Sequence, residues 1–308
     1  MAHTRPAVDV PFDPTQLRTV LCPVDFSNLS GREIDVAIEL CQTFRARLIL
    51  HHNLGGAPPA LSKAWEWEGS HHPEERTDVE VEGKMRELLE RVPSSVRVEA
   101  RLTRGPVATS LVCLAEQLPA DLLVLGCHGW TTEEHVSVTE RLLERCPCPV
   151  LTIHEGHCEG RTFRLGRRQV DDPATVLVPT DFSPSAEEAV HSAFVLARKY
   201  PIRVHLYHVP ESIRIVGARS PGSPGPLEEV QRQLEDLIPL DLLDRVSCHV
   251  ETGSVSEKIV EFADRLHPDL MIMGRHARGL FRRFTRDTSR DLLHRACCPV
   301  WFVAGQPA

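Results

Sequence analysis

Two short glycine-containing segments of this 308-residue chain could bind a phosphate group. Gly126 and Gly129 flank a cysteine and a histidine directly after an apolar run, and Gly274 follows a similar run in the second half. Because glycine has no side chain, its backbone amide can approach an anion closely, and the N-terminus of a following helix adds a favourable partial charge. Asp25 and Asp181 each end another apolar run and could bind other polar parts of the same ligand.

Histidine and cysteine side chains near these segments suggest two other kinds of chemistry. His51 and His52 end a further apolar run, and Cys127 and His128 lie within the first glycine segment. With Asp25 they form a ligand set that suits zinc, but they lack the Cys-x2-Cys spacing that identifies a zinc site, so we assign no metal ligand. Two more cysteines precede the last apolar run of each half, Cys146 and Cys148 in the first and Cys297 and Cys298 in the second. We expect them to be buried as small apolar side chains, with redox sensing as the alternative.

The segments that position these residues occur twice along the chain. Four blocks return in the same order: 19–27 as 175–183, 104–105 as 252–253, 122–126 as 270–274, and 148–150 as 298–300. Such a repeat indicates a duplicated unit, and the chain length also suits two domains.

Each half alternates short apolar runs with longer segments of helical periodicity. The runs predict strands at 19–25, 47–53, 97–102, 122–126 and 150–154, and again at 175–181, 203–208, 246–251, 269–274 and 300–304. Helices are predicted near 29–44, 75–91, 107–117 and 137–145, and again near 185–199, 227–237, 255–265 and 287–295. Continuous Val, Leu and Ile runs are typical of parallel strands covered on both faces, so we expect an α/β fold. Ser27 and Ser183 are expected to cap the first helix of each half.

Composition and charge exclude several classes of protein. The formal net charge of −8 gives no general basic field for nucleic acid or an anionic membrane. A hydrophobic content of 42% excludes disorder throughout the chain. No apolar run approaches the roughly 20 residues that span a bilayer, and the first residues lack a secretory signal. Ten cysteines are too sparse for a disulfide scaffold, so we expect a cytoplasmic protein with reduced thiols and without membrane or nucleic-acid partners.

In their order and spacing these blocks resemble the universal stress protein (UspA-like) family, with two domains in tandem. The resemblance rests on the Asp-Phe-Ser motifs at Asp25 and Asp181, the Arg-Gly-Pro at 104–106, the glycine loop, and the Cys-Pro-Val before the last strand. It implies two Rossmann-like (adenine nucleotide alpha hydrolase-like) doubly wound five-stranded parallel sheets, each in the order 3-2-1-4-5. It also implies that the two domains pair through their last strands within the chain, and that two chains could form a homodimer.

The resemblance implies that members of the family that bind ATP or AMP carry a Gly-x2-Gly-x9-Gly-Ser/Thr loop after the fourth strand. Neither half of this chain keeps that loop intact. In the first half Val136 stands where the third glycine belongs, and two glutamates occupy 133–134. In the second half Ala277 replaces the second glycine, and Arg286 and Asp287 replace the Gly-Ser pair. Branched and charged side chains at these positions oppose a triphosphate. The candidate contacts of ATP or AMP are Asp25, Gly126, Gly129, Ser137, Asp181, Gly274, Arg286 and Thr288. The two aspartates could instead cap the helices that follow them.

The segment 277–290 is strongly basic. It carries Arg278, Arg282, Arg283, Arg286 and Arg290. These arginines could clamp a phosphate anion, form a solvated helix face, or pair with the acidic first half.

No hydrolytic motif such as Gly-x-Ser-x-Gly, His-Glu-x2-His or a Walker loop occurs, so we assign no catalytic residue.

These observations favour a stress-response protein that acts through binding and is not an enzyme. The alternative is an ATP- or AMP-binding switch, or a weak ATPase, that uses the second domain. A thiol or metal sensor that uses Cys127 is the third hypothesis. The expected division is a flexible arm at 1–17, a first domain at 18–155, a linker at 156–173 and a second domain at 174–305.

Overall fold

The computed structural model describes residues 12–26, 30–55, 78–127, 138–154, 169–210, 225–275, 291–293 and 295–304. The first half contains β1 (Thr19–Pro23), α1 (Ser30–Phe44), β2 (Arg47–Asn53), α2 (Asp78–Arg91), β3 (Val98–Thr103), α3 (Val107–Gln117), β4 (Leu122–Cys127), α4 (Val138–Arg145) and β5 (Val150–His154). The second half contains β6 (Ala174–Pro179), α5 (Pro184–Lys199), β7 (Ile202–His208), α6 (Pro226–Glu235), β8 (Val246–Val250), α7 (Val255–Leu266), β9 (Leu270–Arg275) and β10 (Val300–Ala304). The elements η1 (Pro14–Gln16) and η2 (Leu240–Leu242) are short 3-10 helices. Residues 291–293 and 295 are also helical.

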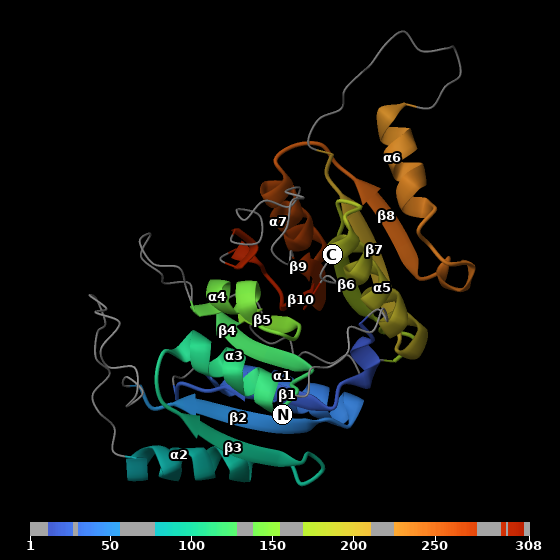
Figure 1. Ribbon diagram of the computed structural model, residues 1–308. Helices are drawn as coiled ribbons and strands as arrows, with labels where there is room; N and C mark the ends of the chain where they lie inside the picture. The colour runs from blue at the N-terminus through green and yellow to red at the C-terminus, as the bar shows by residue number, and fades with distance from the viewer. Residues whose placement is uncertain are drawn as a thin grey trace.

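All ten strands belong to one sheet, in the order β3-β2-β1-β4-β5-β10-β9-β6-β7-β8 (Figure 1). The order 3-2-1-4-5 is therefore confirmed in both halves, and the two predicted sheets are the halves of a single one. Strands within a half are parallel, whereas β5 and β10 pair in antiparallel fashion, with Leu151 opposite Trp301. The two halves thus pair through their last strands within one chain. Because this central pair is antiparallel, the carboxyl ends of the two sets of strands lie at opposite edges of the sheet.

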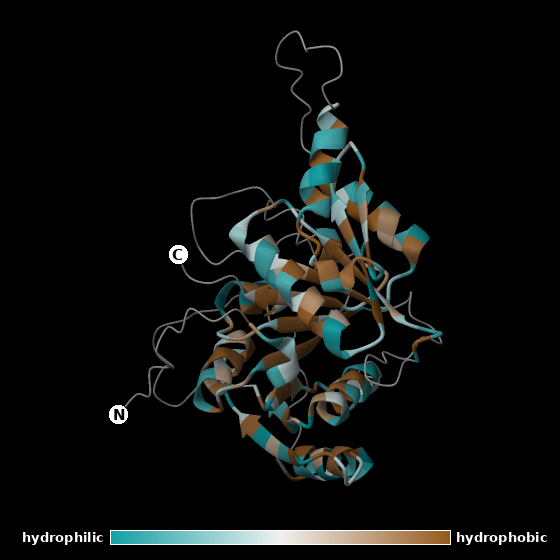
Figure 2. Ribbon diagram, turned by 90° about the vertical axis from the view of Figure 1, so that its right-hand side faces the viewer, coloured by the Kyte–Doolittle hydropathy of each residue, from teal (hydrophilic) through white to brown (hydrophobic). Residues whose placement is uncertain are grey.

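Helices cover both faces of the sheet, so the strands are apolar on both sides (Figure 2). Helices α1, α2, α5 and α6 contribute to one apolar cluster and α3, α4 and α7 to the other. Alternate residues of each strand enter opposite clusters: Leu48 and Leu50 of β2 enter the first, and Ile49 enters the second. This double burial explains the continuous apolar runs in the sequence. No helix in the described part of the chain is long and apolar enough to span a membrane.

The segment before β1 differs from its prediction as a flexible arm. Residues 12–17 are ordered: Asp13 caps η1 by accepting a hydrogen bond from the backbone nitrogen of Thr15, and Leu17 is buried. The ring of Phe12 packs edge-on against Trp301 of β10, with 6.2 Å between the ring centroids. Apolar contact with the second half therefore orders this stretch, while residues 1–11 lie outside the described part of the chain.

A partly buried arginine joins the two halves on the α4 side of the β5–β10 pair. Arg275, the last residue of β9, donates a hydrogen bond from Nη2 to the carbonyl oxygen of Cys146 at 2.8 Å. Its Nη1 lies 3.5 Å from the carbonyl oxygen of Leu142. Leu142 lies in the last turn of α4, where its carbonyl oxygen also accepts a hydrogen bond from the backbone nitrogen of Cys146, and Cys146 directly follows the helix. Burial lowers the pKa of the Arg275 guanidinium. The first half has Cys127 at the corresponding position, so this contact between the halves is made on one side only.

Candidate functional site

The candidate ligand-binding edge of each half lies where the strand order reverses. Asp25 follows β1 and Gly126 lies in β4, and these two strands are neighbours at that point. Asp181 and Gly274 occupy the corresponding places after β6 and in β9. Such a switch point is where open parallel sheets bind ligands. The other predicted contacts, Gly129, Ser137, Arg286 and Thr288, lie outside the described residues, as do His128 and Ser27.

The aspartate at each switch point is followed by a phenylalanine in the left-handed backbone region. Phe26 has a φ of 60° and Phe182 a φ of 59°, which is costly for a non-glycine residue. Each ring packs against a histidine at the end of the neighbouring strand, His52 at 4.4 Å and His208 at 4.8 Å between centroids. Each histidine donates from Nδ1 to the carbonyl group just after β1 or β6, at 2.7 Å in both halves. These contacts stabilise the tight turn, which explains why the strand predicted over 19–25 ends at Pro23.

The two aspartates differ in their surroundings. Asp25 is exposed, whereas Asp181 is partly buried and its Oδ1 accepts a hydrogen bond from the backbone nitrogen of Ser183 at 3.0 Å. The other carboxylate oxygen of Asp181, Oδ2, is buried and has no hydrogen-bond partner within the described residues. The cap of α5 is Ser183, whose hydroxyl accepts a hydrogen bond from the backbone nitrogen of Ala186, as predicted. In the second half, therefore, Asp181 is not needed as the helix cap.

A buried carboxylate lies against the glycine of the first switch point. Glu33, in the first turn of α1, is only 6% exposed, and a Cβ atom placed on Gly126 would lie 1.6 Å from its Oε1. The charge of Glu33 also acts on Cys22, whose thiol pKa is raised first by burial and then by this neighbour. In the second half the corresponding residue is Ala189, and Gly274 packs instead on the backbone of α5. The first site therefore holds an acidic side chain against its glycine, and the second has none at the matching position.

Sequence reasoning did not identify Glu33. A single glutamate in an amphipathic helix is ordinarily expected on the solvent face. The signal that could have identified it is the comparison of the two halves, since Ala189 stands at the matching position.

The two adjacent histidines at the end of β2 do not form one site. His52 lies on the α1 side of the sheet, whereas His51 points to the other face and is 1% exposed. The Nε2 atom of His51 lies 2.7 Å from the hydroxyl oxygen of Thr103, and its Nδ1 has no hydrogen-bond partner within the described residues. Burial, and then the neighbouring His52, lower the pKa of His51 to about 4. In the part of the chain that the structure covers, no three His, Cys, Asp or Glu side chains gather as a metal site.

Replacing His51 with glutamine is expected to flatten the pH dependence of stability. In the unfolded chain the imidazole of His51 has a pKa near 6.5, whereas in the folded protein its pKa is about 4. Between these pH values the unfolded state therefore binds a proton that the folded state does not bind. The free energy of unfolding therefore falls as pH drops between these values, by up to about 1.4 kcal/mol per pH unit. Urea unfolding of wild type and His51→Gln at several pH values between 4 and 6.5 measures the slope. The exposed-site variant His267→Asn is the control, and an unchanged slope in His51→Gln would contradict the assignment.

The thiols before the last strands lie as expected, with one exception. Cys146, Cys148 and Cys298 are buried, whereas Cys297 is partly exposed. The Sγ atoms of Cys146 and Cys148 lie 3.5 Å apart, and the hydrogen bond between the two thiols lowers the pKa of Cys146.

Comparison with known proteins gives one family. The model described as "Universal stress protein family" matches residues 16–154 and again 174–304. The chain is similar to universal stress protein Sll1654 of Synechocystis, at 30% identity over 141 residues, which is 44% of this chain and 85% of that protein. It is also similar to universal stress protein MJ0531 of Methanocaldococcus jannaschii, at 26% identity, over 44% of this chain and 81% of that protein. The crystal structure of a universal stress protein from Archaeoglobus fulgidus matches the fold with a TM-score of 0.69, covering 96% of this chain and 98% of that one at 18% identity.

Proposed function

Because this chain belongs to the universal stress protein family, with one copy of the domain in each half, we propose that it is a cytoplasmic stress-response protein that acts by binding and not by catalysis. In this proposal the first domain has lost its affinity for adenine nucleotides, and any nucleotide binds in the second domain. A homodimer of such chains would form through a surface other than β5 and β10, which already pair within the chain.

The observation that carries this proposal is the buried carboxylate of Glu33 against Gly126. The glycine loop of a nucleotide-binding member begins at this residue, so the phosphates would approach the same place. Two like charges 8 Å apart repel by about 2 kcal/mol at an effective dielectric constant near 20. A triphosphate carries several such charges, and Ala189 shows that the fold does not require a carboxylate at this position.

Substituting Glu33 with glutamine is expected to raise the affinity of the first half for ATP, measured in the full chain, by about tenfold. Glutamine keeps the volume and removes the charge, so the gain would come from electrostatics alone. Calorimetric titration with ATP measures it, and Glu82→Gln on the exposed side of α2 is the charge-matched control. The proposal fails if wild type binds one ATP in each half, or if Glu33→Gln and Glu82→Gln titrate alike.

The second candidate function is a nucleotide-dependent switch in the second domain. It is favoured by the Oδ2 atom of Asp181, which is buried at the switch point and accepts no hydrogen bond from the described residues. The same titrations test it: ATP or AMP would bind with a stoichiometry of one, and Asp181→Asn would weaken binding, while Arg286→Gly with Asp287→Ser would strengthen it. Phosphate release above the buffer rate, lost in Asp181→Asn, would identify an ATPase and overturn the non-catalytic proposal.

A further inference from the structure

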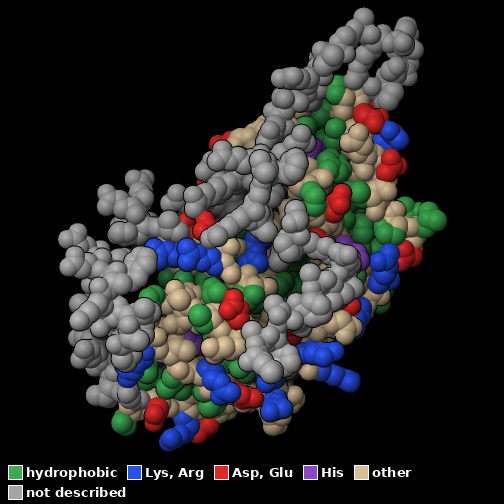
Figure 3. Space-filling view, in the orientation of Figure 1, with side chains coloured by type: hydrophobic (Ala, Val, Ile, Leu, Met, Phe, Trp, Pro, Cys, Tyr) green, Lys and Arg blue, Asp and Glu red, His purple; other side chains and the backbone are tan. Residues whose placement is uncertain are grey.

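A concave site lies at the edge of the sheet opposite the switch point of the first half. It is an open pocket of about 840 Å³ at the amino ends of β1, β2 and β3. Nine residues line it: Arg18, Cys41, Gln42, Thr43, Arg45, Ala46, Arg47, Ser95 and Arg97. We call it the arginine pocket. Lys and Arg side chains gather near this end of β2 and β3 on the lower part of the surface in Figure 3.

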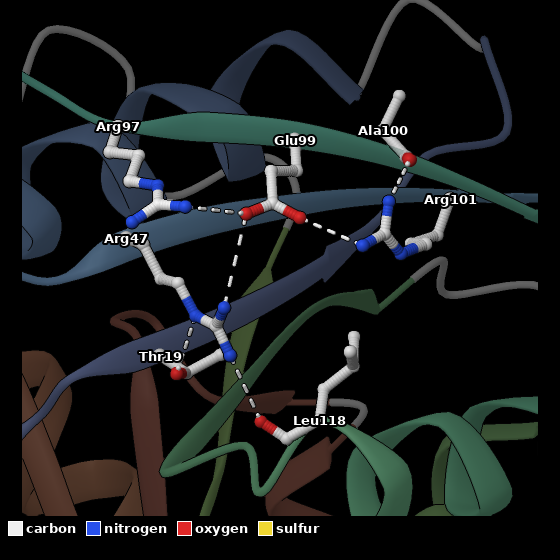
Figure 4. A network of polar contacts seen from close by, with 7 residues as sticks. All are labelled: Thr19, Arg47, Arg97, Glu99, Ala100, Arg101 and Leu118. Atoms are coloured by element: carbon white, nitrogen blue, oxygen red, sulfur yellow. Dashed lines mark hydrogen bonds and ion pairs between the residues drawn. The ribbon is translucent and has the colours of Figure 1, made fainter.

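The arginine pocket holds more positive charge than its neighbours neutralise. Four of its lining residues are arginines and none is acidic. One carboxylate, Glu99 of β3, serves two of these arginines: its Oε1 lies 3.6 Å from Arg97 and 3.9 Å from Arg47 (Figure 4). The other oxygen of Glu99 binds Arg101 at 2.8 Å, so this carboxylate is already shared among three guanidinium groups.

The remaining two arginines have no charged partner among the residues that the structure describes. Neither Arg18 nor Arg45 makes an ion pair through its guanidinium group with any described residue, and both side chains are exposed. Asp121 lies nearby, but its Oδ2 accepts hydrogen bonds from the backbone nitrogens of Arg18 and Thr19. Arg45 follows the last residue of α1, where a cation stabilises the helix dipole. That explanation does not cover Arg18 and Arg97, which come from the segments before β1 and β3.

The second half provides an internal comparison. Arg203 and Arg245 stand at the register positions of Arg47 and Arg97. Arg245 donates to the carbonyl oxygen of Ala197 at 2.9 Å. In the first half it is Arg47 that is held in this way, by the hydroxyl oxygen of Thr19 at 3.0 Å and the carbonyl oxygen of Leu118 at 3.3 Å (Figure 4), which leaves Arg18, Arg45 and Arg97 to face the pocket. The positions of Arg18, Arg45 and Glu99 hold Ala174, Pro201 and Ser247 in the second half. The cluster of four arginines is thus a feature of the first half alone, and the fold does not require it.

We propose that the arginine pocket binds a small anion with two or more phosphate groups, such as pyrophosphate. A guanidinium group recognises phosphate oxygens by paired, charge-assisted hydrogen bonds. The four arginines come from three separate segments, so one multiply charged anion could bridge groups that a single phosphate would not reach together. Since most of these side chains are exposed, binding should weaken as the salt concentration rises. The pocket lies at the opposite edge from Asp25 and Gly126, and this inference is therefore independent of nucleotide binding there.

Calorimetric titration of the full chain with pyrophosphate at low salt tests the inference. We expect saturable binding that weakens at least tenfold in Arg45→Gln/Arg97→Gln and less than twofold in the control Arg198→Gln/Arg203→Gln, which removes two exposed arginines of the second half. Thermal unfolding checks that both variants keep the fold.

The other outcomes separate the sources of the anion. Competition by ADP that depends on Arg45 and Arg97 would support the pocket and identify a nucleotide as the source of the phosphates. Four results would overturn the inference: no saturation in wild type, equal losses in both double variants, equal affinity for inorganic phosphate, or loss caused instead by Arg282→Gln/Arg286→Gln.

Discussion

Alanine in place of Gly274 is expected to lower the free energy of unfolding by about 3 kcal/mol, whereas alanine in place of Gly126 is expected to lower it by about 1 kcal/mol. The two glycines occupy the same place in β9 and β4. A Cβ atom on residue 274 would lie 2.1 Å from the carbonyl oxygen of Ser185 and 2.7 Å from the nitrogen of Ala186. Both atoms belong to the backbone of α5, so relief requires the helix to move away from the sheet.

At Gly126 the first obstacle is a side chain. The added methyl group would meet the carboxylate of Glu33, which can rotate away at the cost of its buried position. Urea unfolding of the two single variants measures the difference. The variant Glu33→Ala/Gly126→Ala should lose less stability than the two single losses combined, because Glu33→Ala removes the clash. Equal losses in Gly126→Ala and Gly274→Ala would show that the helix does not limit the space at β9.

Replacing Arg275 with methionine is expected to lower the free energy of unfolding by about 2 kcal/mol. Methionine fills much of the volume but has no donor, so the carbonyl oxygen of Cys146 would lose its partner from the other half, whereas that of Leu142 keeps the backbone nitrogen of Cys146. A buried polar group that loses its hydrogen bond costs more than the bond contributes on average.

Two further variants separate the hydrogen bonds from other effects of Arg275. Arg275→Lys keeps a donor and the charge but loses the forked geometry, and is expected to lie between wild type and Arg275→Met. Arg203→Met, at an exposed position of the same half, is the control and should leave unfolding by urea unchanged. If Arg275→Met is as stable as wild type, the desolvation of the guanidinium group cancels its hydrogen bonds.

The parts of the fold that follow local rules were predictable from the sequence. The apolar runs located all ten strands because parallel strands covered on both faces contain few polar residues. The resemblance to a family supplied the strand order, and the repeat indicated that the halves pair. Ser183 was recognised as a helix cap because capping depends on neighbouring residues only.

Features that depend on distant contacts were missed. The segment with Phe12 contains three prolines nearby and no periodicity, yet it is ordered by a ring almost 290 residues away, Trp301. Glu33 is buried because a glycine in another element leaves room for its carboxylate. Arg275 is partly buried because the C-terminal end of α4 in the other half supplies acceptors. The arginine pocket likewise joins residues from three segments, which no local pattern brings together.

The covalent link between the halves has a consequence for how such a protein can evolve. In a dimer of identical subunits every substitution appears twice, at both symmetry-related positions, and must be tolerated at both. In this chain Arg275 contacts the end of α4 on one side of the β5–β10 pair, whereas Cys127 stands at the matching position on the other side. Glu33 likewise has Ala189 at its matching position. In a single fused chain a substitution appears in one half only. One half can therefore lose the ability to bind a ligand while the other half keeps it.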